Sequence, residues 1–138
     1  MTDPSWNLEA GERAARLARA QAALGPRLAG KRVDAGAITE LLHAVLAPGD
    51  RVCLEGNNQK QADFLARALV QLDPQQVHDL HMVQSVLALP EHLDVFENGI
   101  ARRLDFSFSG PQGARLAKLV SARQLEIGAI HTYLELFA

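Results

Sequence analysis

The sequence is poor in cysteine and has no long apolar run. Cys53 is the single cysteine among 138 residues, which excludes an internal disulfide and fits a reducing cytoplasm. Its place in a short apolar stretch predicts a buried, inert thiol. No run approaches the roughly 18 apolar residues of a membrane-spanning helix, and the N-terminus lacks the apolar core of a secretory signal. These absences favour a globular cytoplasmic domain with no membrane partner.

Acidic residues are missing from one part of the chain. The formal net charge is −2, which argues against nucleic-acid binding by bulk electrostatics. Residues 13–32, however, contain six basic residues and no acidic ones. Within them Arg13, Arg16 and Arg19 are spaced by three and therefore lie along one side of a helix. A solvated helix face is the favoured interpretation, and a docking edge for an acidic partner is the alternative.

Most motifs that identify an active site are also absent. The sequence contains no GxGxxG dinucleotide fingerprint, no GxxxxGK[ST] phosphate loop and no GxSxG nucleophile elbow. The five histidines are scattered without HExxH or a CxxC partner, so a metal site is not expected. His131 is the histidine best placed for acid–base chemistry, although a packing or capping role is favoured. A nucleotide site is suggested only by the strand–glycine–helix pattern at 51–60.

The periodicity of the apolar residues predicts two helices followed by an alternation of strands and helices. Helices are expected over 5–24 and 35–47, with a linker at 25–34. Strands are expected at 51–55, 77–86, 103–109 and 125–130, each followed by a helix. Such alternation predicts an α/β fold: a mostly parallel, Rossmann-like sheet with helices on both faces, preceded by two helices. The expected division is a helix and linker at 1–34 and an α/β domain at 35–138.

The end of the sequence adds one further expectation. Residues 133–138 have the pattern of an apolar helix start and carry no polar tail. We therefore expect an incomplete sheet, and a sequence that is the N-terminal part of something longer.

Ligands of parallel α/β sheets bind beyond the carboxyl ends of the strands. Four loops are expected to meet there, and they are rich in amides, hydroxyls and glycines. These loops hold Glu55, Gly56, Asn57, Asn58 and Gln59, then Gln84 and Ser85, then Ser107 to Gly113, and finally His131 and Thr132. Such groups suit a polar or anionic ligand held by hydrogen bonds. From spacing alone, self-capping turns and a rigid turn at 110–113 are the favoured interpretations.

Three long runs resemble a known family. EGNNQKQADFLARAL at 55–69, the run at 77–120 that includes FSFSGPQGARL, and EIGAIHTYLELFA at 126–138 look like the α subunit of malonate decarboxylase. That family is related to the family I coenzyme A transferases and to the citrate lyase α subunit. The resemblance covers 50–138 closely and is weak over 1–49.

The resemblance implies an acyl-carrier-protein transferase with a coenzyme A transferase-like fold. Family members move the carrier protein's thiol from acetyl to malonate, and other subunits then decarboxylate the malonyl thioester. The carrier bears a phosphoribosyl-dephospho-coenzyme A arm, so the subunit itself needs no bound cofactor. The implied partners are the acyl carrier protein, the decarboxylase subunits, malonate and an acetyl thioester.

The resemblance also implies where contacts lie. Family I transferases usually keep a catalytic glutamate in a second half that this sequence does not match, so we assign no catalytic residue and expect this stretch alone to be inactive. The expected thioester or pantetheine contacts are Gly56, Asn57, Asn58, Gln59, Gly110, Pro111 and Gln112. The alternative is a non-catalytic α/β binding or scaffold module of a multi-subunit complex.

Overall fold

The computed structural model describes residues 4–30, 32–55, 62–107 and 110–130. The chain divides into two compact units, Met1–Leu46 and Ala47–Ala138. None of the helices in the described ranges is long and apolar enough to cross a membrane.

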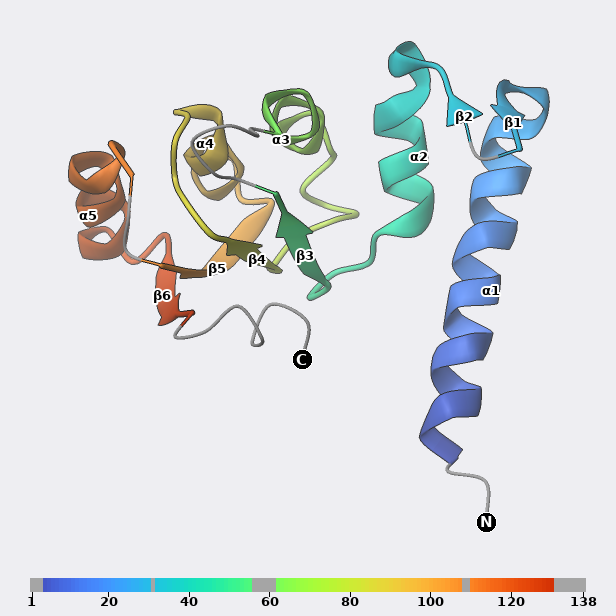
Figure 1. The fold of residues 1–138 in the computed structure, drawn as a ribbon, viewed down its shortest axis with the longest axis horizontal. Helices are drawn as coiled ribbons and strands as arrows, with labels where there is room; N and C mark the ends of the chain where they lie inside the picture. The colour runs from blue at the N-terminus through green and yellow to red at the C-terminus, as the bar shows by residue number, and fades with distance from the viewer. Residues whose placement is uncertain (1–3, 31, 56–61, 108–109, 131–138) are drawn as a thin grey trace. The chain divides into compact units, whose positions relative to one another are not determined.

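The first unit is a helical hairpin with a small β-ribbon between its helices (Figure 1). Its elements are α1 (Pro4–Leu24), a 3-10 turn (Gly25–Arg27), β1 (Leu28–Ala29), β2 (Arg32–Val33), a 3-10 turn (Ala35–Ala37) and α2 (Ile38–Val45). Both predicted helices are confirmed. The expected linker contains an antiparallel ribbon in which Leu28 pairs with Val33 and Ala29 pairs with Arg32. Gly30, with φ +65°, permits the tight turn between these strands.

Two of the three spaced arginines of α1 hold the end of α2. Arg16 Nη1 donates to the Val45 carbonyl oxygen at 2.9 Å, and Arg19 Nε donates to the Ala44 carbonyl oxygen at 2.9 Å. The last carbonyls of a helix lack intrahelical partners and form the negative end of its dipole, so cations stabilise them. These contacts join α2 to α1, and both helices belong to the unit Met1–Leu46. The expected domain boundary after residue 34 stays a prediction.

The second unit alternates strands and helices. Its elements are β3 (Arg51–Leu54), α3 (Asp63–Val70), β4 (Leu80–Gln84), α4 (Glu91–Glu97), β5 (Ala101–Phe106), α5 (Gly113–Ser121) and β6 (Glu126–Ala129). The four strands pair in the order β3-β4-β5-β6, and every pair is parallel. The predicted α/β fold with a parallel sheet is confirmed. Strand β4 starts three residues later than predicted, after Asp79, whose φ of +55° is incompatible with a strand.

The described helices of this unit cover one face of the sheet, where the sequence analysis expected both. Helices α3, α4 and α5 lie in a row over the same side (Figure 1). The strand order explains this, because each crossover places the next strand on the same side of the strand before it. Because parallel crossovers have a single hand, an order without a reversal puts all of its helices on one side.

The core of this unit lies between that helix row and the sheet. Alternate strand residues such as Met82 and Leu104 are fully buried, as period-2 geometry requires of the covered face. Leu69, Leu93 and Leu119 from the three helices are buried as well.

The predicted burial of the Cys53 thiol is wrong. The thiol is exposed and not buried. Cys53 alternates with Val52 and Leu54, and Leu54 is the buried residue on the helix side. The cysteine therefore points to the other face. It also lies in β3, which ends the described strand order, so only β4 flanks it within the described sheet.

Candidate functional site

The four strands end in one row at the carboxyl edge of the sheet. Leu54 pairs with Gln84, Gln84 with Phe106, and Phe106 with Ala129. The loops that follow these residues therefore leave the sheet at the same edge. The structure describes Glu55 of the first loop and parts of the second and third, so the meeting of all four loops stays a prediction.

The predicted contact residues fall into two groups. Gly56, Asn57, Asn58 and Gln59 lie outside the described residues, as do His131 and Thr132. Gly110, Pro111 and Gln112 are described and lie directly before α5. That these residues contact a thioester or pantetheine stays a prediction.

Gly110 brings two loops of this edge into direct contact. Its φ is +119°, and a Cβ built on it would lie 2.3 Å from the carbonyl oxygen of Leu87. Leu87 belongs to the crossover from β4 to α4, and Gly110 to the crossover from β5 to α5. Only glycine allows both this backbone conformation and this approach. Without a side chain at residue 110, the two crossovers pack backbone against backbone.

Gln112 lies at the N-terminus of α5. Its carbonyl oxygen accepts the Leu116 N–H at 3.0 Å, which starts the helix. Its side chain makes no capping hydrogen bond to α5, and the residue is half-buried next to the exposed Pro111. A helix N-terminus presents free N–H groups and a positive dipole end. An amide at this place can donate to a carbonyl or carboxylate oxygen.

Two serines of the predicted loops are brought together. The Ser107 hydroxyl donates to the Ser85 carbonyl oxygen, which joins the ends of β5 and β4. The sequence predicted both residues at this edge but not their contact, because residues 85 and 107 become neighbours only when the two strands pair.

Salt bridges hold α5, the helix after the Gly110 turn, against α4. Arg115 of α5 donates to Glu97 at 2.9 and 2.7 Å, to Asp94 at 2.6 Å and to the Pro90 carbonyl oxygen at 2.8 Å. The hydrogen bonds from Arg115 lower the pKa of Glu97. Because these acceptors belong to α4 and to Pro90 directly before it, Arg115 sets how α5 packs on α4.

His92 is a buried histidine with no hydrogen-bond partner among the described residues. Its side chain is 1% exposed, and both ring nitrogens are unpaired. Burial lowers the pKa of His92, and the nearby Glu91 and Asp63 carboxylates oppose that shift only in part. The folded protein therefore holds His92 neutral at pH values where the unfolded chain protonates it.

Replacing His92 should change the acid stability of the protein. The unfolded state binds more protons than the folded state below pH 6.5, so stability falls as the pH drops through this range, by at most about 1.4 kcal/mol per pH unit for one group. His92→Leu removes this dependence and the unpaired nitrogens, so we expect a gain of about 1 kcal/mol at pH 7.5 and a larger gain at pH 5. Urea unfolding at both pH values measures it.

His92→Gln is the matched control. Glutamine keeps a donor and an acceptor but does not titrate, so the acid dependence should disappear without the gain at pH 7.5. An unchanged difference between the two pH values in both variants would show that His92 is not the titrating group.

A polar cluster lies on the sheet face away from the helix row. His81 Nε2 lies 2.7 Å from Asp105 Oδ2, and Arg103 Nε donates to Asp105 Oδ1 at 3.3 Å. Asp105 is 8% exposed, and its carboxylate lies against Gly128, where a Cβ would be 1.8 Å from Oδ1. The burial of Asp105 depends on residues from three strands.

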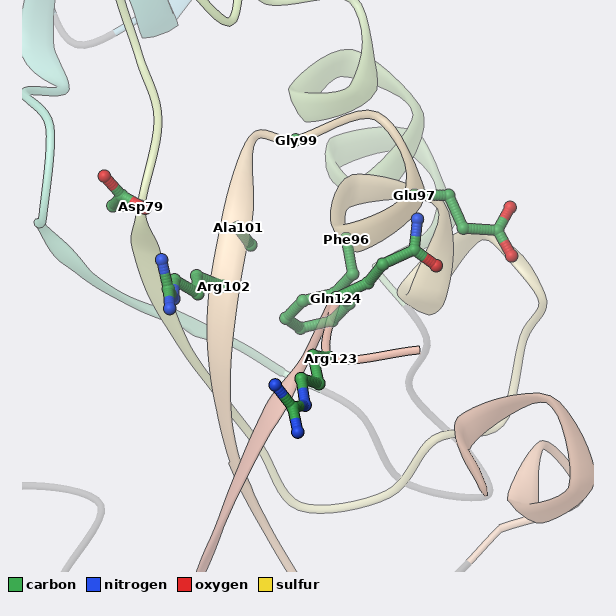
Figure 2. Close-up of a pocket in the computed structure, with 8 residues that line it drawn as sticks. All are labelled: Asp79, Phe96, Glu97, Gly99, Ala101, Arg102, Arg123 and Gln124. Atoms are coloured by element: carbon green, nitrogen blue, oxygen red, sulfur yellow. The ribbon is translucent and has the colours of Figure 1, made fainter. Parts of the chain in front are cut away.

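A cavity of about 280 Å³ lies at the opposite, amino edge of the sheet. Figure 2 shows the residues that line it, which come from the end of α4, the start of β5 and the turns before β4 and β6. Asp79, Gly99 and Arg123 line it with φ values of +55°, +74° and +58°. Sequence reasoning did not predict this cavity. Because ligands of parallel sheets bind at the carboxyl ends, the cavity is not part of the predicted site.

Within the described ranges no three histidine, cysteine, aspartate or glutamate residues are grouped so that they could hold a metal ion.

Comparison with known proteins gives consistent matches. A family model described as malonate decarboxylase, alpha subunit, transporter, matches residues 5–138. An acetyl-S-ACP:malonate ACP transferase of Malonomonas rubra is 58% identical over 98 residues, which are 71% of this chain and 18% of that protein. The crystal structure of a malonate decarboxylase alpha subunit from Acinetobacter baumannii aligns with a TM-score of 0.81 and 49% identity, covering 92% of this chain and 23% of that one.

A Pseudomonas malonate decarboxylase hetero-tetramer, solved in complex with malonate, contains a chain that aligns with a TM-score of 0.82 and 49% identity over 99% of this chain and 24% of its own. This chain therefore spans only about a fifth to a quarter of the length of these relatives. The family model and the Pseudomonas structure include the first unit, where the sequence resemblance was weak. Because the family model covers nearly every residue, the chain belongs to the malonate decarboxylase alpha subunit family.

Proposed function

We propose that the intact protein transfers an acyl carrier protein thiol from an acetyl group to malonate. The acetyl thioester and malonate give the malonyl thioester and free acetate, so one thioester bond forms as another breaks. The observation that carries this proposal is the 58% identity to a protein named for that reaction. The carboxyl edge of the parallel sheet, with its amide, hydroxyl and glycine groups, supports it, because a thioester and its arm are bound by hydrogen bonds of this kind.

In this proposal the chain supplies binding groups and not the catalytic one. The turn at Gly110, Pro111 and Gln112 and the loop at 56–59 contact the thioester and the pantetheine part of a phosphoribosyl-dephospho-coenzyme A arm. Gln112 and the free N–H groups of the α5 N-terminus offer donors to oxygen atoms there. The protein binds no cofactor of its own, because the arm belongs to the carrier protein.

The proposed partners are the acyl carrier protein and the decarboxylase subunits, in the cytoplasm. Support comes from the Pseudomonas relative, which is part of a hetero-tetramer. Decarboxylation of a thioester would follow transfer, because the acetyl thioester has no carboxylate to lose and the malonyl thioester has one.

The reaction is tested with the intact gene product, acetylated carrier protein and isotope-labelled malonate. We expect release of unlabelled acetate and a labelled malonyl group on the carrier protein, both detected by mass spectrometry. Tight binding of a partner subunit with no exchange would reject the transferase and leave a binding or scaffold module.

The site is tested separately in the same assay. Asn57→Ala, Asn58→Ala and Gln112→Ala should each depress transfer more than they lower the free energy of unfolding. Gln124→Ala is the matched control, since Gln124 is an exposed glutamine at the amino edge. Wild-type turnover in the three variants would show that these residues are not part of the site, and would leave the proposed function standing.

A further inference from the structure

Two helices, α4 and α5, end at the cavity of the amino edge in the same way. After each helix cap, two consecutive N–H groups donate back to carbonyl oxygens of the last turn, at distances between 2.9 and 3.3 Å. This Schellman motif places the first of the two donor residues in the left-handed conformation, where glycine is the usual residue. That residue is Gly99 after α4, with φ +74°, but Arg123 after α5, with φ +58°.

The backbone of Arg123 is strained where a glycine would not be. A side chain disfavours the left-handed conformation, because its Cβ crowds the neighbouring backbone. Asp79, with φ +55°, is the other non-glycine residue with a positive φ in the described ranges, and it lines the same cavity. Strained backbone of this kind gathers at functional sites. We therefore looked for a role of the side chains at this cavity.

The acidic groups of the cavity have partners, whereas Arg123 has none among the described residues. Glu97 accepts two hydrogen bonds from Arg115, at 2.9 and 2.7 Å, and its carboxylate points away from the two guanidinium groups of the cavity (Figure 2). Asp79 Oδ2 lies 2.9 Å from His78 Nδ1. The Arg123 side chain lines the cavity with no hydrogen bond or ion pair to a described residue. Its charge is therefore available to a ligand.

Arg102 is the second cation of the cavity. Its Nε donates to Glu126 at 3.1 Å, but both side chains are 62% exposed. An ion pair as exposed as this one contributes little to stability, so Arg102 can exchange Glu126 for another anion. Phe96 and Ala101 add apolar surface to the lining.

The charge and the size of the cavity select its ligand. Guanidinium groups bind carboxylates and phosphates through paired N–H donors. The volume of about 280 Å³ lies at the small end of ligand sites, which begin near roughly 300 Å³. We propose that this cavity binds a small organic anion, a carboxylate or a phosphate ester with a short apolar body, through Arg123 and Arg102. The site lies at the edge opposite the proposed transfer site and does not rest on the transferase function.

Modification by phenylglyoxal, which reacts with accessible guanidinium groups, tests the site one arginine at a time. The intact gene product is treated with and without butyrate as the carboxylate probe or ethyl phosphate as the phosphate probe, at an ionic strength kept constant with chloride. Peptide mass spectrometry then measures the modification of each arginine. We expect a probe to slow the modification of Arg123 and Arg102, and not that of the exposed Arg13 of α1.

Arg123→Gly separates backbone strain from binding. Glycine removes the strain, so the urea midpoint of unfolding should rise. The probe concentration that half-protects Arg102 should also rise, about tenfold, because one charge-assisted contact is lost. Asp79→Gly is the matched control, since it relieves the same kind of strain at the same cavity. It should raise the urea midpoint as well, but leave the protection of Arg102 and Arg123 intact.

Three results would overturn the proposal. A lower urea midpoint in Arg123→Gly would show that the arginine serves to stabilise the end of α5. Equal modification of Arg123 with and without both probes would show that no anion binds there. Equal protection of Arg13 would show general screening of arginines and no site. Protection of Arg123 and Arg102 by butyrate alone, or by ethyl phosphate alone, would support the proposal and identify the ligand as a carboxylate or as a phosphate ester.

Discussion

Gly110→Ala should both destabilise the protein and depress acyl transfer. Alanine at φ +119° is strained, by about 1–3 kcal/mol, and its Cβ would meet the Leu87 carbonyl oxygen at 2.3 Å and the Leu87 carbonyl carbon at 2.7 Å. Both atoms are backbone, so the overlap is relieved only when one crossover moves. We expect a loss of about 3 kcal/mol or more in the free energy of unfolding.

The effect on transfer should exceed the effect on folding. The turn from Gly110 to Gln112 carries predicted contacts, and a misplacement near 1 Å in a binding site reduces turnover about 100-fold. To separate the loss of transfer from the loss of folded protein, transfer is measured on the fraction that remains folded, at a temperature well below the unfolding midpoint. Near wild-type transfer in folded Gly110→Ala would show that this turn does not position the substrate.

Two other glycines separate the two causes of the stability loss in Gly110→Ala, which are backbone strain and the contact with Leu87. Gly99 has φ +74° but no atom within 4 Å of a built Cβ, so Gly99→Ala should carry the backbone strain alone, about 1 kcal/mol. Gly113 has neither feature and begins α5, so Gly113→Ala should be neutral or slightly stabilising. If Gly110→Ala is no worse than Gly99→Ala, the contact with Leu87 has no energetic role.

Gly128→Ala should have the second large effect, on stability. Its Cβ would lie 1.8 Å from Oδ1 and 2.9 Å from Cγ of Asp105. The short Asp105 side chain cannot avoid this overlap without rotating away from His81, to which it is bonded at 2.7 Å. A largely buried carboxylate then loses its partners. We expect a loss of about 2–3 kcal/mol in the free energy of unfolding, measured by urea titration.

A double-mutant cycle shows whether the stability loss in Gly128→Ala comes from the overlap with Asp105. In the Asp105→Ala background the carboxylate is gone, so Gly128→Ala should cost much less than in the wild type. The coupling between the two sites should lie within the range of about 0.5–3 kcal/mol seen for residues in contact. Equal costs in both backgrounds would show that the loss comes from the β6 backbone and not from Asp105.

The elements of the fold could be predicted from the sequence because their signals are local. The spacing of the apolar residues in α1 and α2, and the alternation in β5, depend only on the period of one segment. The order of those segments was enough to predict a parallel sheet, and with it the edge at which Ser85, Ser107 and Gly110 lie. The family resemblance came from the same residues and is confirmed by the family model.

Other features depend on which segments pair, and no single segment contains that information. The order β3-β4-β5-β6 put the described helices of the sheet unit on one face and left Cys53 exposed. The contacts of Arg16 and Arg19 joined α2 to α1. The burial of Asp105 against Gly128, and of Gln84 in an apolar row, arose because residues far apart in the sequence share one register. The sequence by itself determined the elements and the edge of the site, because both follow from local periodicity. Tertiary structure decided which side chains are buried, paired or left unpaired, because these depend on neighbours that only folding brings together.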